Sequence, residues 1–157
     1  MKLTDFLYES QKVDDKYKAD RFIRGWTLYP TKNLERAKAG GLLSALKVYP
    51  FKRRLKLYRG ISFSTEKNFL KFLKETNNFT ALNDKYLTSW TPSKQQAETF
   101  ALIDDDYGTG DYAGILISMV FDNSLPAIDC TKSEEGENEI ILFPGMHKIK
   151  LEKQKLL

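Results

Sequence analysis

The sequence predicts an α+β fold in which residues 1–50 form a helical N-terminal layer and residues 51–157 form a strand-rich core. Apolar residues recur at helical spacing before Pro50, and short β-prone runs bounded by turn residues follow it. The helices gather in the first third instead of alternating with strands, which is typical of α+β proteins. A chain of 157 residues suits a single domain with one sizeable core.

Three helices are expected in the first 50 residues. Thr4 caps a short first helix, and residues 14–29 form a second helix that ends at Pro30. Thr31 caps a third helix, and the glycine pair at residues 40–41 weakens or breaks that helix midway.

The strand-rich part contains two further helices with recognisable caps. Ser64 or Thr65 caps the first of them, and Ser93 with Gln96 forms a capping box for the second. Their apolar side chains are expected to face the core, namely Phe69, Leu70, Phe72 and Leu73 in the first helix and Ala97, Phe100 and Ala101 in the second. The remaining apolar runs predict strands at residues 57–61, 86–91, 114–121, 127–130, 137–143 and 147–152.

Composition narrows the class of protein. The 41% hydrophobic and 29% charged residues are typical of a soluble globular chain, and no apolar run has the length that a membrane span needs. The start of the chain lacks the long apolar region of an export signal, and a single cysteine excludes an internal disulfide, so a reducing cytoplasm is expected. The net charge of +4 suits an anionic partner, whether a nucleotide, a nucleic acid or an acidic protein surface.

Two glutamates near the C-terminus suggest a site. On the predicted strand at residues 137–143, Glu137 and Glu139 point to the same face, roughly 7 Å apart, while Asn138 points to the other face. Like charges held this close repel each other, and a stable core does not require such a pair. The alternative is a solvated strand face whose acidic residues resist edge pairing. The aspartates at residues 104–106 lack the spacing of a calcium loop, so a solvated turn is the better interpretation. His147 is a lone histidine at a strand start, which favours a structural role over a catalytic one.

Three motifs follow one another in a distinctive order. The first is Arg59 within an apolar strand, and the second is Ser89 at a strand end, followed by a capped helix that carries Ala97 and Phe100. The third is the pair of glutamates at residues 137 and 139. In this order the chain resembles the arginine-specific mono-ADP-ribosyltransferases of the Arg-Ser-Glu type, and most of all the small enzymes of T-even bacteriophages. The resemblance covers about residues 56–150.

The resemblance implies a role for each motif. Glu139 would stabilise the cation that forms at the ribose and bind its 2′-hydroxyl, and Glu137 would orient the incoming guanidinium. Arg59 would hold the phosphates of NAD, and the backbone of Gly60 would meet the nicotinamide amide. Ser89 would brace Glu139 through a hydrogen bond.

Two further positions are implied in the cofactor site. The family's Ser-Thr-Ser segment reads Ser89, Trp90, Thr91 here, so Thr91 keeps a hydroxyl and Trp90 is expected to turn toward the core or a helix. Phe100 lies where the family places an aromatic ring against the nicotinamide, although a plain core position is the simpler interpretation. Residues 131–136 would form the loop that presents the acceptor to Glu137.

The resemblance also implies a fold, a reaction and partners. N-terminal helices would pack on two small, mostly antiparallel sheets around an NAD cleft. The chain would transfer ADP-ribose from NAD to an arginine of a protein and release nicotinamide, with no metal. For a phage enzyme the acceptors would be host transcription or translation proteins in the host cytoplasm, with no membrane and only indirect contact with nucleic acid.

Two alternatives remain. One is an NAD glycohydrolase, which passes ADP-ribose to water and needs little from Glu137. The other is a catalytically silent, nucleic-acid-binding module that uses the basic residues 52–54 and the C-terminal lysines.

Overall fold

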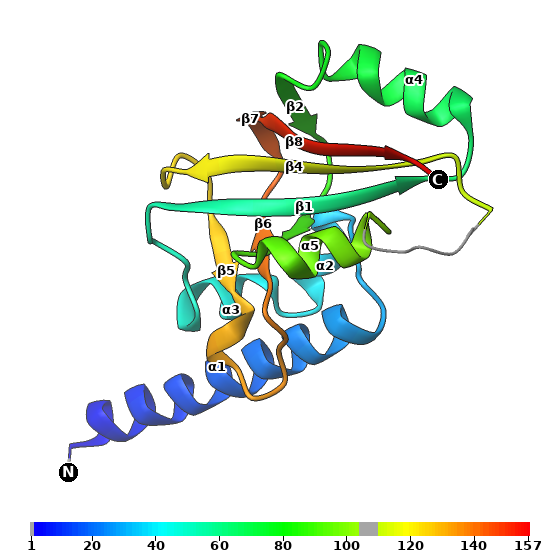
Figure 1. Ribbon diagram of the computed structural model, residues 1–157. Helices are drawn as coiled ribbons and strands as arrows, with labels where there is room; N and C mark the ends of the chain where they lie inside the picture. The colour runs from blue at the N-terminus through cyan, green and yellow to red at the C-terminus, as the bar shows by residue number, and fades with distance from the viewer. Residues whose placement is uncertain (1, 104–109) are drawn as a thin grey trace.

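The computed structural model describes residues 2–103 and 110–157 and confirms a mixed α+β architecture. Figure 1 shows the N-terminal helices on one side of the strands and α4 (Glu66–Glu75) at the opposite end of the molecule. None of the described helices combines the length and the apolar character that a membrane crossing requires.

The first helix, α1 (Leu3–Leu28), is continuous, so the prediction of two separate helices was wrong. No glycine or proline interrupts the chain between Leu3 and Arg24, so nothing in this stretch ends a first helix. Asp14 pairs with Lys18 one turn further along the same helix, at 2.9 Å, which supports a helix that continues.

Two short helices follow, α2 (Leu34–Ala39) and α3 (Leu42–Val48). The expected break at the glycine pair is confirmed, because Gly41 adopts a left-handed φ of 108° that favours glycine. The predicted cap was two residues early: Asn33, and not Thr31, accepts the backbone N–H of Arg36 at the start of α2.

The helical layer has its own core. The last turns of α1 bury Ala19, Phe22, Ile23 and Trp26 against α3 and against strand residues that include Ile128 and Ile141. This packing fixes the C-terminal end of α1 beside the strands, where Trp26 reaches the pocket described below.

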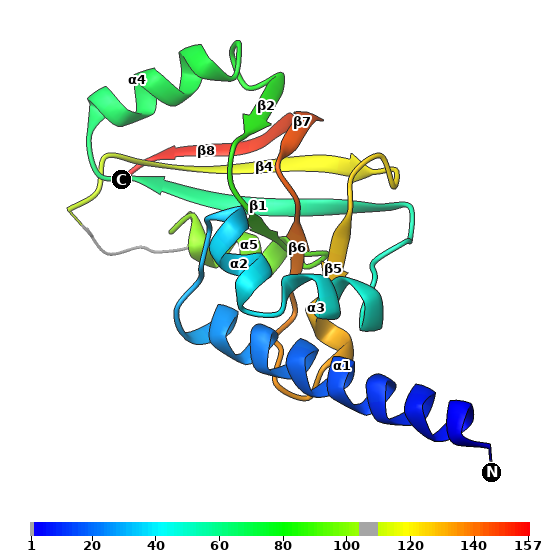
Figure 2. The ribbon, with the colours of Figure 1, turned by 180° about the vertical axis from the view of Figure 1, so that it is seen from behind.

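The strands of the described residues form three antiparallel sheets, one more than expected. Strands β1 (Leu55–Phe63), β4 (Ala113–Phe121) and β8 (Lys150–Leu156) form one sheet, and β3 (Thr88–Trp90), β6 (Ile140–Leu142) and β5 (Ala127–Asp129) form another. A two-stranded ribbon joins β2 (Ala81–Asp84) to β7 (Gly145–Lys148). Strand β2 was not predicted from the sequence, because it ends in Asn and Asp, which are uncommon in strands. Figure 2 shows the same arrangement from behind.

The helices among the strands follow their predicted caps. Thr65 caps α4 and Ser93 caps α5 (Lys94–Phe100), each by accepting a backbone N–H three residues on. On α4, Phe69 is buried and two neighbours pack against the core, but Leu70 is 49% exposed, contrary to expectation. The C-terminal strand predicted at residues 147–152 is two strands, β7 and β8, which are separated at Ile149.

Candidate active site

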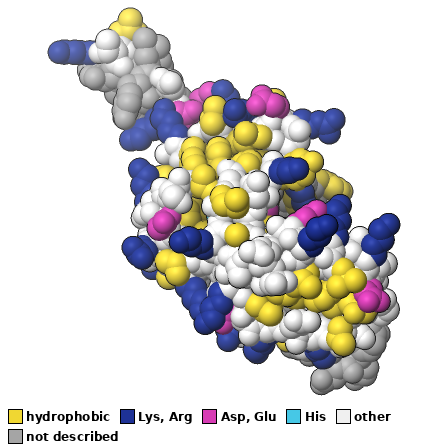
Figure 3. Space-filling view, turned by 90° about the horizontal axis from the view of Figure 1, so that it is seen from above, with side chains coloured by type: hydrophobic (Ala, Val, Ile, Leu, Met, Phe, Trp, Pro, Cys, Tyr) yellow, Lys and Arg dark blue, Asp and Glu magenta, His cyan; other side chains and the backbone are white. Residues whose placement is uncertain are grey.

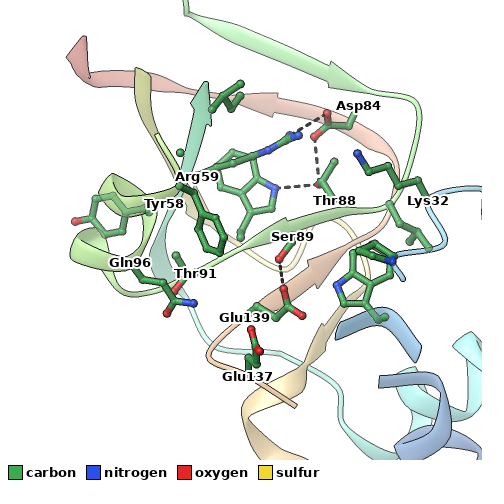
Figure 4. Close-up of a pocket in the computed structure, with 18 of the residues that line it drawn as sticks. Lys32, Tyr58, Arg59, Asp84, Thr88, Ser89, Thr91, Gln96, Glu137 and Glu139 are labelled. Atoms are coloured by element: carbon green, nitrogen blue, oxygen red, sulfur yellow. Dashed lines mark hydrogen bonds and ion pairs between the residues drawn. The ribbon is translucent and has the colours of Figure 1, made fainter. Parts of the chain in front are cut away.

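A pocket of about 560 Å³ opens where the two three-stranded sheets meet. Tyr58 on β1 and Thr91 just after β3 join the sheets here through two backbone hydrogen bonds, of 2.7 and 2.9 Å. All the site residues predicted from the sequence line this pocket: Arg59, Gly60, Ser89, Thr91, Phe100, Glu137 and Glu139. Figure 4 shows that the two glutamates lie together at one end and Arg59 lies at the other.

At the acidic end, the Ser89 hydroxyl donates a hydrogen bond to the carboxylate of Glu139. These residues are 50 positions apart in sequence, and the pairing of β3 with β6 brings them together, since Ser89 lies opposite Ile141. Burial raises the pKa of Glu139, and the negative charge of Glu137 raises it further. Hydrogen bonds from Ser89 and Trp26 lower that pKa and so favour the ionised form.

The two glutamates do not lie on a strand, so the argument from strand alternation was wrong. Strand β6 begins at Ile140, and the N–H of Glu139 donates to the carbonyl of Glu137 at 2.8 Å, which closes a tight turn. Gly136 permits the loop to approach η1 (Cys130–Lys132), because a Cβ there would lie 2.0 Å from the Cys130 carbonyl oxygen. The turn still directs both carboxylates to the same pocket, with Glu137 exposed and Glu139 partly buried.

The loop before the glutamates is fastened to the helical layer by Asp20 of α1. Its carboxylate accepts hydrogen bonds from Ser133 at 2.8 Å and from Tyr49 at 2.6 Å. Burial alone would raise the pKa of Asp20, but the hydrogen bonds from Tyr49, Ser133 and Lys16 lower it, so the carboxylate stays ionised. No pattern in the sequence predicted the link between Ser133 and Asp20, which joins residues 113 positions apart.

At the opposite end, Arg59 forms an ion pair that the sequence did not reveal. Its Nη1 lies 3.5 Å from Oδ1 of Asp84, and its guanidinium lies 5.9 Å from the centre of the Trp90 ring. Burial lowers the pKa of Arg59 and the charge of Asp84 opposes that shift, and a guanidinium remains protonated throughout. Trp90 itself is buried in the core, as expected.

Asp84 is the centre of a small polar network behind the pocket wall. Thr88 donates to Asp84 at 3.4 Å and accepts from the Trp90 indole at 3.0 Å. Nε2 of His147 lies 3.6 Å from Asp84 and is the one buried side-chain polar atom among the described residues without a hydrogen-bond partner. Burial lowers the pKa of His147, so it is neutral near pH 7. In the sequence, Asp84 reads as an ordinary turn residue between Asn83 and Lys85, so nothing marked it.

The close packing of α5 on the sheet accounts for the positions of Gly60 and Phe100. A Cβ at Gly60 would lie 1.8 Å from the carbonyl oxygen of Ala97, and one at Gly114 would lie 1.9 Å from that of Ala101. The helix backbone therefore lies directly against these two glycines, and the small side chains of Ala97 and Ala101 are fully buried. Phe100 is accordingly 62% exposed at the pocket, and its predicted core position was wrong.

Thr91 lines the pocket, but its hydroxyl forms a hydrogen bond with the backbone rather than facing the cavity as a free group. The residue is buried, and its Oγ1 accepts the backbone N–H of Ser93 at 3.0 Å, at the start of α5. The hydroxyl therefore shapes the turn between β3 and α5.

Comparisons with known proteins add nothing to this geometry: no protein family, curated protein or solved structure matches the chain. Among the side chains that the structure describes, no three of the metal-binding types gather around a common point. The aspartates at residues 104–106 lie outside the described residues.

Proposed function

We propose that this chain is an NAD-dependent mono-ADP-ribosyltransferase that modifies an arginine of a protein, on an ADP-ribosyltransferase-like fold. The observation that carries the proposal is the hydrogen bond from Ser89 to Glu139 within a pocket that also contains Arg59 and Glu137. The three sequence motifs are far apart along the chain and were selected for their order, their spacing and the kind of element that carries each. Their convergence on one pocket supports a common task.

The proposed reaction begins with cleavage of the bond between nicotinamide and ribose. The bonding electrons leave with nicotinamide, which departs as a neutral molecule, and positive charge develops on the ribose ring. The fixed carboxylate of Glu139 stabilises this charge, and the hydrogen bond from Ser89 holds the carboxylate in place. A guanidinium nitrogen of the acceptor then bonds to the ribose carbon and loses a proton, which Glu137 is placed to accept.

The exposed position of Glu137 favours a protein acceptor over water. A carboxylate at the rim can meet a guanidinium carried by another macromolecule, and the pair of opposite charges orients the attacking nitrogen. Water needs no such partner.

We therefore expect Glu137→Gln to separate the two half-reactions. Transfer to protein should fall by at least about tenfold, while release of nicotinamide in the absence of acceptor should stay within about threefold of wild type. Transfer is measured with a polyarginine acceptor, and nicotinamide release is measured in a parallel assay without acceptor. Equal losses of transfer and of nicotinamide release would contradict the proposed role of Glu137 toward the acceptor. Unchanged transfer would contradict it as well.

The hydrogen bond from Ser89 should be visible in the pH dependence of nicotinamide release. Because this bond lowers the pKa of Glu139, Ser89→Ala should raise that pKa and move the acidic limb of the rate profile to higher pH. Profiles from pH 4 to pH 8 for both proteins test this, with Ser62→Ala, another serine of the pocket lining, as the control that leaves the limb in place. A limb that moves to lower pH, or does not move, would contradict the assignment.

The nucleic-acid-binding alternative finds less support. On the face shown in Figure 3, Lys and Arg side chains are scattered among apolar and acidic ones and form no continuous basic groove. Several basic residues are also paired with acids, such as Lys56 with Glu152 at 2.7 Å and Lys153 with Glu98 at 2.8 Å.

A further inference from the structure

The pocket has two ends of opposite charge. Glu137 and Glu139 make one end acidic, whereas Arg59, Asp84 and Lys32 lie toward the other end. Two cations and one carboxylate leave that second end with one net positive charge. A ligand that carries phosphates is repelled by the acidic end and attracted to the other, so the pocket sets the direction in which an anionic ligand lies.

The charge of Arg59 is already balanced by a neighbouring acid. Its side chain is 26% exposed, it is paired with Asp84, and it packs over the ring of Trp90. The carboxylate of Asp84 is only 10% exposed and balances the charge of the guanidinium. A phosphate that approached Arg59 alone would meet a neutralised pair.

Lys32 is the cation at this end that has no partner. Among the described residues its ammonium makes no ion pair or hydrogen bond, and its side chain is exposed. Figure 4 shows this side chain directed toward the end of the pocket where Arg59 and Asp84 lie, and away from the glutamates.

The backbone holds Lys32 in this position. Its carbonyl accepts the N–H of Leu87 at 3.1 Å, which ties the segment to the residue before β3. Asn33 follows at once as the cap of α2, so the chain on that side is fixed as well. A lysine with an anchored backbone and a free ammonium is suited to bind a phosphate as a point charge.

We infer that Lys32 binds the diphosphate of a nucleotide in this pocket, opposite the wall that Arg59 and Asp84 form. The inference rests on the proposed function for the identity of the full ligand, a dinucleotide. The contact between Lys32 and a diphosphate does not depend on the reaction, so a binding measurement can test it directly.

The test is calorimetric titration of the purified chain with ADP and with adenosine at low ionic strength. Lys32→Gln should weaken ADP binding about tenfold and leave adenosine binding within about twofold, because only the diphosphate carries the charge that Lys32 meets. Lys32→Arg keeps the charge and should retain ADP binding within about threefold. Lys85→Gln removes an exposed lysine next to the pocket-lining residues Asp84 and Tyr86, and serves as the matched control with unchanged binding.

The outcomes separate the two proposals. Equal ADP affinity for wild type and Lys32→Gln overturns the role of Lys32, even if the wild-type chain cleaves NAD. Loss of ADP binding in Lys32→Gln in a chain that never cleaves NAD supports Lys32 as a diphosphate contact and overturns the proposed reaction. A wild-type chain that does not bind ADP at all overturns the diphosphate contact, whereas the proposed reaction is judged by NAD cleavage alone.

Discussion

Glu139→Gln is expected to lower the rate of nicotinamide release by about 10²–10³-fold and, at the same time, to stabilise the fold at pH 8. Glutamine has the shape of glutamate without its charge, so the pocket keeps its form but no longer stabilises a cation at the ribose. A carboxylate that is partly buried beside Glu137 is costly to the folded state. Its removal should therefore raise the melting temperature.

The stability gained by Glu139→Gln should depend on pH, because folding raises the pKa of Glu139. The pKa of Glu139 is higher in the folded chain than in the unfolded chain, mainly because of burial, so ionisation penalises folding at pH values above the folded pKa. Below the ordinary glutamate pKa both states are protonated and the penalty is absent. The stabilisation by Glu139→Gln should be present at pH 8 and should vanish as the pH falls through these values.

Glu134→Gln is the matched control, since Glu134 is exposed on the same loop and does not line the pocket. It should change neither the rate nor the melting temperature. A Glu139→Gln protein that keeps more than a third of the wild-type rate would remove Glu139 from the reaction. A melting temperature lower than that of wild type at pH 8 would contradict the electrostatic account of this carboxylate.

Gly60→Ala is expected to produce the largest loss of stability, about 3 kcal/mol or more in the free energy of unfolding. The added Cβ would lie 1.8 Å from the Ala97 carbonyl oxygen and 2.7 Å from the Ala101 nitrogen. Both atoms belong to backbone, so the helix α5 as a whole must move away from β1. Phe100 and Gln96 would move with it, and the pocket would open on that side.

Chemical denaturation of Gly60→Ala beside Gly25→Ala tests this. Gly25 lies inside α1, and beyond its chain neighbours and the backbone of its own helix nothing lies within 4 Å of an added Cβ, so alanine there should be neutral or stabilising by up to about 1 kcal/mol. A Gly60→Ala protein within about 0.5 kcal/mol of wild type would mean that α5 does not pack on the sheet as closely as described.

Local signals in the sequence predicted the parts of the fold that depend on neighbouring residues. The caps at Thr65 and Ser93 were correct because a hydroxyl meets an N–H only three residues away. Strand β4 was correct to within one residue, because a long apolar run has few other conformations open to it. The break after α2 was correct because it depends on glycine alone.

The errors arose where tertiary contacts decide the structure. Alternation predicted that Glu137 and Glu139 share a strand face, but a backbone hydrogen bond between them forms a turn instead. Helical spacing placed Phe100 inward, but the close approach of α5 to two glycines leaves no space for a ring.

The candidate site likewise contains residues that the sequence predicted and residues that only the structure revealed. The order of Arg59, Ser89 and Glu139 carried enough information to select residues that meet in one pocket. The residues that complete the pocket came from the structure, because Asp84 and Lys32 belong to no motif. Only the pairing of β2 with β7 and the bond from Leu87 to Lys32 bring them to the site.

The central claim is that this pocket cleaves NAD and transfers ADP-ribose to arginine. The most direct test incubates the purified chain with tagged NAD and a bacterial lysate, beside Glu139→Gln and Glu137→Gln, and maps the tag by mass spectrometry while free nicotinamide is measured in the same samples. We predict tagged arginine residues with wild type, none with Glu139→Gln, and nicotinamide release that persists in Glu137→Gln. No nicotinamide release by the wild-type chain, with or without lysate, would contradict the account.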